Sequence, residues 1–167
     1  TLAYIHLSYE KNYPEAQKYA LKLVSVYPNN PVFERFLGKC YVGLSNMNSG
    51  AELYKAMIAK ADSNLTGYNN NYLRREANYY LGVCVSRMGN LDDALKYYET
   101  AINICKSIDK EGEESPYYVF SLLGSGVIYE QKGNKPEAIK YYDRVLNMRD
   151  VENSKETAQR FKDNALK

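Results

Sequence analysis

The stretch from residue 80 to residue 102, YLGVCVSRMGNLDDALKYYETAI, decides which fold this sequence predicts. Apolar and small side chains recur every three or four residues on both sides of Gly89 and Asn90, which is the spacing of one face of an α-helix. Gly89 can supply the positive φ that ends a helix, and Asn90 is a favoured N-cap for the next one. The stretch therefore predicts two helices joined by a tight turn.

The same pattern recurs at an interval of 44 residues. The sets that keep their chemical type are Gly38, Gly82, Gly126; Tyr41, Val85, Tyr129; Asn46, Asn90, Asn134; Gly50, Ala94, Ala138; and Tyr54, Tyr98, Tyr142. An earlier unit begins with Asn12, 34 residues before Asn46. Internal repetition at such periods is typical of stacked helix pairs. We therefore predict four units, at about residues 1–30, 31–70, 71–115 and 116–150.

Glycines inside the first helices indicate that the two helices of a unit pack closely. A helix-interior Gly costs about 1 kcal/mol relative to Ala, so close approach of the second helix must offset that loss. We expect the facing residues to be small as well, at Gly50, Ala94 and Ala138, and the larger tyrosines at Tyr54, Tyr98 and Tyr142 to reach the next unit.

The composition is that of one folded soluble domain: 167 residues, 45% hydrophobic and 25% charged. With 22 basic and 20 acidic residues, the net charge of +2 gives no bulk electrostatic argument for binding nucleic acid or anionic lipid. No apolar run approaches the roughly 20 residues needed to insert across a membrane. The chain begins with Thr1 instead of Met, so we expect an upstream segment with further repeats. The expected location is cytoplasmic, with export as the alternative.

No set of residues points to catalysis, and we predict no cofactor, no metal and no catalytic residue. The three cysteines lack the spacing of a metal cage. Cys40 and Cys84 occupy equivalent positions in successive units, where the next unit has Ile128, so they are interpreted as small hydrophobic side chains. His6, the only histidine, has no acid or nucleophile beside it in the sequence.

The third unit carries a recognisable motif, formed by Leu81, Gly82, Val85, Gly89, Ala94, Tyr98 and Ala101. It resembles the tetratricopeptide repeat family, and the long period is similar to that of kinesin-light-chain-like repeats. The resemblance covers about residues 2–148 and implies an all-α, right-handed α-solenoid of stacked antiparallel helix hairpins. Residues 151–167, amphipathic from 154 to 166, are predicted to form a C-terminal capping helix.

The resemblance also implies a concave groove, lined by the first helices, that binds a peptide or a partner helix. Its lining residues would be Arg35, Lys39, Val42, Glu76, Tyr79, Val83, Arg87, Phe120, Leu123, Val127 and Gln131. Arg35 and Lys39, one helical turn apart, would hold a carboxylate or an acidic segment together with Arg87. Lys39 and Val83 stand where the family's carboxylate clamp needs Asn, so a chaperone tail is not the expected ligand.

The chain has 18 tyrosines and no tryptophan. Tyrosine suits half-buried positions between helices, so most are interpreted as core residues; Tyr97 and Tyr141 have no assigned packing role, and Tyr79 is expected to face the groove. The predicted function is a non-catalytic protein-binding scaffold. The alternative is a structural spacer that self-associates through its open N-terminal repeat.

Overall fold

The computed structural model describes residues 12–167, which form eight helices and no strand. The helices are α2 (Tyr13–Val26), α3 (Pro31–Gly43), α4 (Met47–Asp62), α5 (Asn71–Arg87), α6 (Leu91–Ile108), α7 (Pro116–Gln131), α8 (Lys135–Leu146) and α9 (Ser154–Ala165). The expected first helix of the first unit, including His6, lies outside the described residues. None of the described helices is long and apolar enough to span a membrane.

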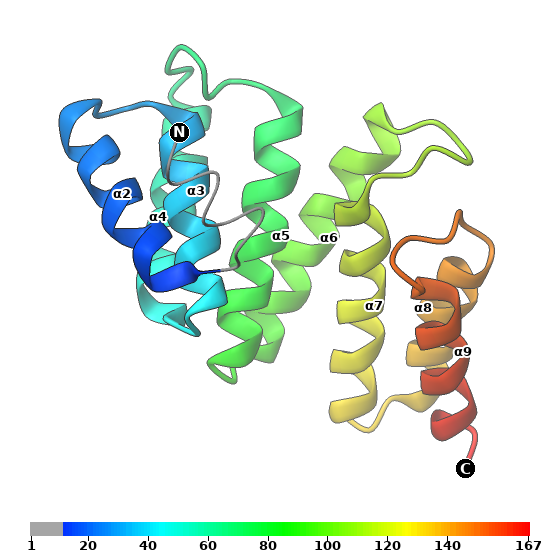
Figure 1. Ribbon diagram of the computed structural model, residues 1–167. Coiled ribbons are helices and arrows are strands. Elements are labelled where there is room, and N and C mark those ends of the chain that lie inside the picture. The colour runs from blue at the N-terminus through cyan, green and yellow to red at the C-terminus, as the bar shows by residue number, and fades with distance from the viewer. Residues whose placement is uncertain (1–11) are drawn as a thin grey trace.

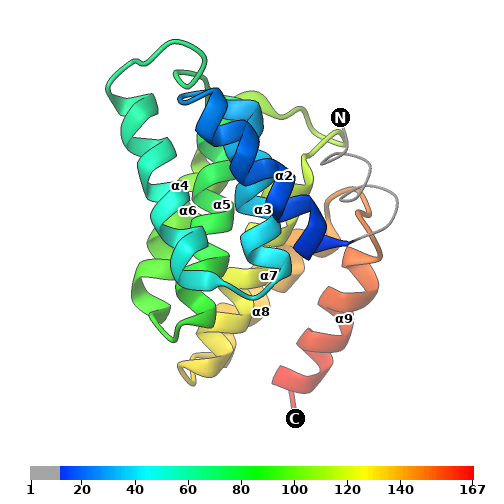
Figure 2. The ribbon, with the colours of Figure 1, turned by 60° about the vertical axis from the view of Figure 1, so that its left-hand side comes forward.

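The helices pair as antiparallel hairpins that stack side by side in chain order (Figure 1). The first helices α3, α5 and α7 form one layer, and the second helices α4, α6 and α8 form the layer behind it. Each second helix contacts the first helix of its own pair and that of the next pair. In the view turned by 60°, α2 lies in front of α3, and α9 lies at the lower right (Figure 2). The fold is an all-α solenoid, as the repeats predicted.

Asparagine side chains start most of the helices. Asn12, Asn46, Asn90 and Asn134 each accept a hydrogen bond from the backbone N–H three residues later. Gly89 has φ +85°, which confirms the predicted turn before Asn90. These caps satisfy backbone donors that would otherwise face no partner at the helix start.

A tyrosine ring from the second helix lies against the glycine of the first helix in every described pair. A Cβ placed on Gly38, Gly82 or Gly126 would lie 2.5, 2.8 or 2.4 Å from the nearest ring carbon of Tyr54, Tyr98 or Tyr142, respectively. The prediction that Gly50 faces Gly38 was wrong. A Cβ on Gly50 would instead lie 2.9 Å from Sγ of Cys84 in the next pair. The glycines therefore make room for an aromatic ring.

The same rings also reach the following pair, as predicted. The ring of Tyr54 stacks on Tyr80 with 5.3 Å between centroids, and that of Tyr142 lies 5.7 Å from Phe161 of α9. Tyr98 is held on both sides by helix backbone, since a Cβ on Gly124 of α7 would lie 2.7 Å from its ring. One side chain thus sets the spacing within a pair and between pairs.

The length beyond the common repeat lies in longer second helices and in two connections, residues 63–70 and 109–115. Both connections place buried side chains against the first helices. The fully buried Tyr68 donates its hydroxyl to Glu34 of α3 at 2.7 Å, and the carboxylate of Asp109 pairs with Arg75 of α5. The connections are therefore packed parts of the fold.

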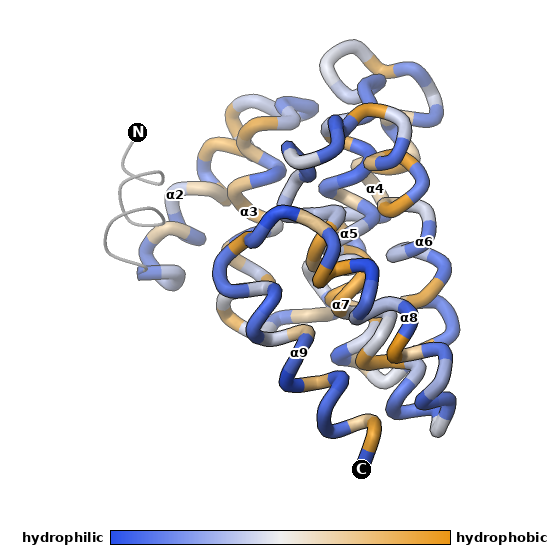
Figure 3. Tube along the Cα trace, turned by 90° about the vertical axis from the view of Figure 1, so that its right-hand side faces the viewer, coloured by the Kyte–Doolittle hydropathy of each residue, from blue (hydrophilic) through white to orange (hydrophobic). Residues whose placement is uncertain are grey.

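Helix α9 packs on α8 and α7, in the position that the first helix of a further pair would take. Its buried side chains are Ser154, Ala158 and Ala165. The trace of α9 is otherwise mostly hydrophilic (Figure 3). Such a helix covers the apolar side of the last pair and presents a polar outer face.

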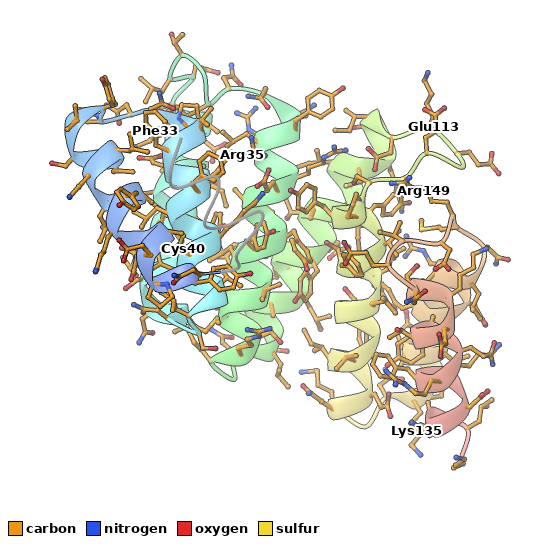
Figure 4. All side chains as sticks on the ribbon, viewed as in Figure 1. Phe33, Arg35, Cys40, Glu113, Lys135 and Arg149 are labelled. Atoms are coloured by element: carbon orange, nitrogen blue, oxygen red, sulfur yellow. The ribbon has the colours of Figure 1, made fainter. Side chains whose placement is uncertain are left out.

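Glu114 ties the connection before α7 to the connection before α9. Its carboxylate accepts hydrogen bonds from the backbone N–H of Gly112 at 3.0 Å and of Arg149 at 3.3 Å, and Arg149 Nε donates to its carbonyl at 2.5 Å. Arg149 lies beside this connection, close to Glu113 (Figure 4). Burial alone would raise the pKa of Glu114, but the backbone hydrogen bonds and the charge of Arg149 outweigh it and lower that pKa.

We expect Gly82→Ala to lower the free energy of unfolding by about 1–2 kcal/mol. Ala is the better helix former by about 1 kcal/mol, but its Cβ would meet a Tyr98 ring that cannot retreat from Gly124. Urea unfolding measures the change, with Asn103→Ala on the exposed side of α6 as the control that gains propensity alone. A Gly82→Ala protein as stable as the parent would contradict the ring-on-glycine packing.

We expect Glu114 to stabilise the fold above its unfolded-state pKa of about 4.3 and to lose that contribution as the pH falls through its lower folded-state pKa. Glu114→Gln should therefore lose less stability than the parent between pH 6 and pH 3. Thermal unfolding over this pH range tests it, with the exposed neighbour Glu113→Gln as control. If the thermal stability of the parent and of Glu114→Gln changes equally with pH, the hydrogen bonds of the Glu114 carboxylate do not stabilise the fold.

Candidate partner-binding groove

The predicted groove residues lie on α3, α5 and α7, in the layer of first helices. Most are half-buried, and Arg87 and Gln131 are exposed. Glu76 and Leu123 are buried, and Leu123, at 7% exposed, packs in the core formed with α8 and α9. Phe120 packs partly against the same core. The far end of the predicted groove is therefore largely committed to packing.

Glu76 is a buried carboxylate between the two cations that were expected to hold a partner. Its side chain is 4% exposed; Oε2 lies 2.5 Å from Arg35 Nη2 and Oε1 lies 3.7 Å from Lys39 Nζ. Figure 4 shows Arg35 between α3 and α5. Burial would lower the pKa of Arg35, but its hydrogen bond to Glu76 and the charge of Glu76 raise it. The chain's own carboxylate thus takes the place proposed for a ligand carboxylate.

Two hollows open between α3 and α5. The first, here called the Arg35 hollow, has a volume of about 390 Å³ and is lined by Val32, Arg35, Tyr72, Arg75, Glu76 and Tyr117, among others. The second, here called the Arg87 hollow, has a volume of about 490 Å³ and is lined by Tyr13, Lys39, Val42, Gly43, Ser45, Tyr80 and Arg87. The structure therefore brings Lys39, Val42 and Arg87 together, and places Arg35 with Glu76.

Tyr79 lies in a cluster of rings, although it was expected to face the groove. Its ring centroid is 4.9 Å from that of Tyr80, 5.6 Å from Tyr117 and 6.2 Å from Tyr98. Burial raises the pKa of Tyr79 to about 12, although the nearby Arg87 acts in the opposite direction. Tyr79 therefore supports the floor of the groove by packing.

Tyr141, which had no predicted packing role, also makes ring contacts. It stacks on Tyr129 with 5.4 Å between centroids, and the guanidinium of Arg144 lies 5.4 Å from its ring centre. Tyr97 is half-buried and packs against the core of the first pairs. Core packing, as predicted for the tyrosines as a class, accounts for both.

The Arg35 hollow also contains four residues outside the predicted groove lining: Val32, Tyr72, Arg75 and Tyr117. The guanidinium of Arg75 lies 5.0 Å from the ring centre of Tyr72 and 5.8 Å from that of Tyr117. Tyr72 is 64% exposed, which is unusual for so large a ring. Tyr72 is the second residue of α5, in its first turn.

Among residues 12–167, no three His, Cys, Asp or Glu side chains are grouped so that they could hold a metal ion. The interpretation of Cys40 and Cys84 as buried hydrophobic side chains is confirmed. Burial raises the pKa of each thiol to about 11. These thiols are therefore protonated at neutral pH and poor nucleophiles.

Comparison with known proteins agrees with this architecture. Residues 73–150 match the model of the tetratricopeptide repeat family. The structure is similar to the TPR-like repeats of a Podosopora anserina protein classed as a kinesin light chain, with a TM-score of 0.75 and 16% identity over 98% of this chain and 82% of that one. It is also similar to MamA, with a TM-score of 0.62 and 18% identity over 94% of this chain and 79% of that one. No curated protein matched the sequence. At these identities the structural likeness concerns the fold.

The resemblance seen in the sequence is thus confirmed by the family match and by the kinesin-light-chain-like neighbour. Residues 73–150 match the tetratricopeptide repeat family, and the stack as a whole shares the fold of the kinesin-light-chain-like repeats.

The pairing of Glu76 changes what a charge reversal at Arg35 should do. We expect Arg35→Glu to lower the free energy of unfolding by about 2 kcal/mol, because it places a second carboxylate beside a buried one. The value lies below the about 3–5 kcal/mol of a fully buried pair because Arg35 is 41% exposed. Urea unfolding of Arg35→Glu, alone and combined with Glu76→Gln, measures it. Equal losses in both backgrounds would show that the pair is not coupled.

Proposed function

We propose that this tetratricopeptide repeat chain is a protein-interaction scaffold that holds an extended segment of a partner protein along α3 and α5, with an acidic side chain of the partner in the Arg87 hollow. The family match supports a protein–protein interaction scaffold in general. The observation that supports the acidic contact is the arrangement of Lys39 and Arg87 around one hollow.

Arg87 is the cation best suited to a partner. It is exposed, it lines the Arg87 hollow, and no ion pair found within residues 12–167 includes it. Lys39 contributes the second charge, since its Nζ lies 3.7 Å from Glu76 and makes no close hydrogen bond there. A carboxylate between two cations gains charge-assisted hydrogen bonds.

The walls of the Arg87 hollow suit the rest of an acidic side chain. Val42 and the rings of Tyr13 and Tyr80 offer apolar surface for its methylene groups, and the hydroxyl of Ser45 offers a further polar contact. This division, with a few polar groups on an apolar lining, is typical of specific binding pockets.

The proposed role is non-catalytic. The cysteines that could serve as nucleophiles are buried, with pKa values raised by burial to about 11. Among the described groove residues, Arg35 and Lys39 pair with Glu76, and Arg87 is exposed. These charged side chains do not form an acid–base–nucleophile set with a hydroxyl or a thiol.

Self-association as a structural spacer is the second candidate. Leu21, Val26 and Tyr27 are 45, 67 and 55% exposed at the N-terminal end of the described stack, and such exposed apolar side chains favour contact with another surface. Sedimentation velocity over a concentration series separates the candidates. A groove-binding scaffold stays monomeric, whereas a spacer grows in mass with concentration.

We expect Arg87→Glu to weaken binding of an acidic peptide by about tenfold or more, because it replaces an attraction by a repulsion in the Arg87 hollow. The probe is a fluorescein-labelled peptide with two glutamates in a Gly/Ser background, measured by anisotropy at two salt concentrations. Binding to the parent should weaken as salt rises.

Lys106→Glu, an equal charge change on the exposed side of α6, is the matched control and should bind like the parent. If Arg87→Glu and Lys106→Glu reduce binding equally, net charge and not the Arg87 hollow attracts the peptide.

A further inference from the structure

The Arg35 hollow gathers an unusual number of buried polar atoms without hydrogen-bond partners. Among residues 12–167, five buried side-chain atoms have none, and three of them belong to residues that line this hollow: Arg35 Nε, Arg75 Nε and Glu76 Oε1. Glu76 itself is 3% exposed. Buried polar groups are nearly always paired, so such a cluster calls for a group that supplies the missing partners.

The missing partners define a chemical pattern. Each arginine Nε is a donor only, and the oxygen of an ionised Glu76 is an acceptor only. A complementary group must therefore accept two hydrogen bonds and donate at least one. A carboxamide does both, since its carbonyl oxygen has two lone pairs and its NH₂ carries two donors.

The charges around the hollow favour a neutral group. Arg35 is paired with Glu76, and Arg75 is paired with Asp109, whose side chain is 7% exposed. Each guanidinium is thus already paired with a buried carboxylate, and Lys39 lies 3.7 Å from the same Glu76. An added carboxylate would meet the negative charge of Glu76, and an added ammonium would meet two guanidiniums, whereas a carboxamide avoids both penalties.

The rim of the hollow selects a side chain over a backbone group. Val32 is 49% and Tyr72 64% exposed, and both line the hollow to which the residues of the three buried, unpartnered atoms also belong. A ligand in this hollow therefore meets exposed apolar surface as well as buried polar atoms. The side chain of glutamine has this form, with two methylene groups below its amide, and the 41% exposed Arg35 can shift to admit it.

We propose that the Arg35 hollow binds the carboxamide of a glutamine side chain in the partner segment. This inference rests on the proposed groove function and adds a second, neutral contact next to the acidic one at the Arg87 hollow. Arg35 and Arg75 donate to the amide oxygen, and the amide nitrogen donates to Glu76.

The test uses the full chain and small probes: the N-acetyl methylamides of glutamine, glutamate, methionine and alanine. Binding is followed by NMR through the Nε–H signals of arginine, with those of Arg35 and Arg75 assigned from Arg35→Lys and Arg75→Lys. We expect the glutamine probe to shift both signals and to bind about fivefold more tightly than the glutamate or methionine probe, the factor of one net hydrogen bond. The alanine probe, which carries backbone amides alone, should not bind.

Glu76→Gln provides the decisive comparison because it removes the charge while keeping the shape. In this variant the freed guanidinium should reverse the preference, so that the glutamate probe binds more tightly than the glutamine probe. Tyr72→Ala, at an exposed position, should weaken all side-chain probes without reversing their order. Lys106→Glu should bind like the parent.

Several results would overturn the carboxamide site. Equal shifts with the alanine and glutamine probes would indicate binding of a backbone amide. An unchanged order of probe affinities in Glu76→Gln would show that Glu76 does not select the carboxamide. No shift with any probe would indicate that water satisfies these atoms. Anisotropy with the diglutamate peptide, run on the same samples, reports separately on the Arg87 hollow, so failure of one site is distinguishable from failure of the other.

Discussion

The contact between a tyrosine ring and a helix glycine is the constraint on which the rest of the structure depends. In each described pair the ring of Tyr54, Tyr98 or Tyr142 lies where any Cβ on the facing glycine would be. A planar ring against bare backbone fixes both the distance and the orientation of two helices, which two small aliphatic residues would leave less defined. Each ring also contacts the helix that follows its pair, so the same side chain sets both the distance within a pair and the distance to the next helix.

This spacing places the first helices α3, α5 and α7 in one layer, and the layer brings their charges together. Glu76 of α5 becomes buried between Arg35 and Lys39 of α3, and Arg75 meets Asp109. The groove charges therefore fall into two kinds. Arg35 and Arg75 are paired with buried carboxylates, whereas Arg87 is exposed and makes no ion pair within residues 12–167.

The helix pairs, their caps and their order could be predicted because they depend on local spacing along the chain. The turn at Gly89 and the cap at Asn90 are examples, since both follow from the chemistry of adjacent residues. The partner of each glycine could not be predicted as easily. Gly50 and Tyr54 lie one turn apart on α4, and spacing alone does not tell which of them faces Gly38.

The contact between Arg35 and Glu76 was also beyond the repeat pattern. A shift of 44 residues relates Arg35 to Tyr79, but the residue that Arg35 meets is Glu76, about one turn earlier on α5. The offset depends on the angle between successive pairs, which no single repeat encodes.

The most direct test of the central packing is the NMR spectrum of the glycine Hα protons. We expect upfield ring-current shifts and contacts to tyrosine ring protons for Gly38, Gly82, Gly124 and Gly126, and neither for Gly89 or Gly133, where a Cβ would meet no atom within 4 Å. Ordinary shifts without ring contacts at Gly82 and Gly124 would contradict this packing.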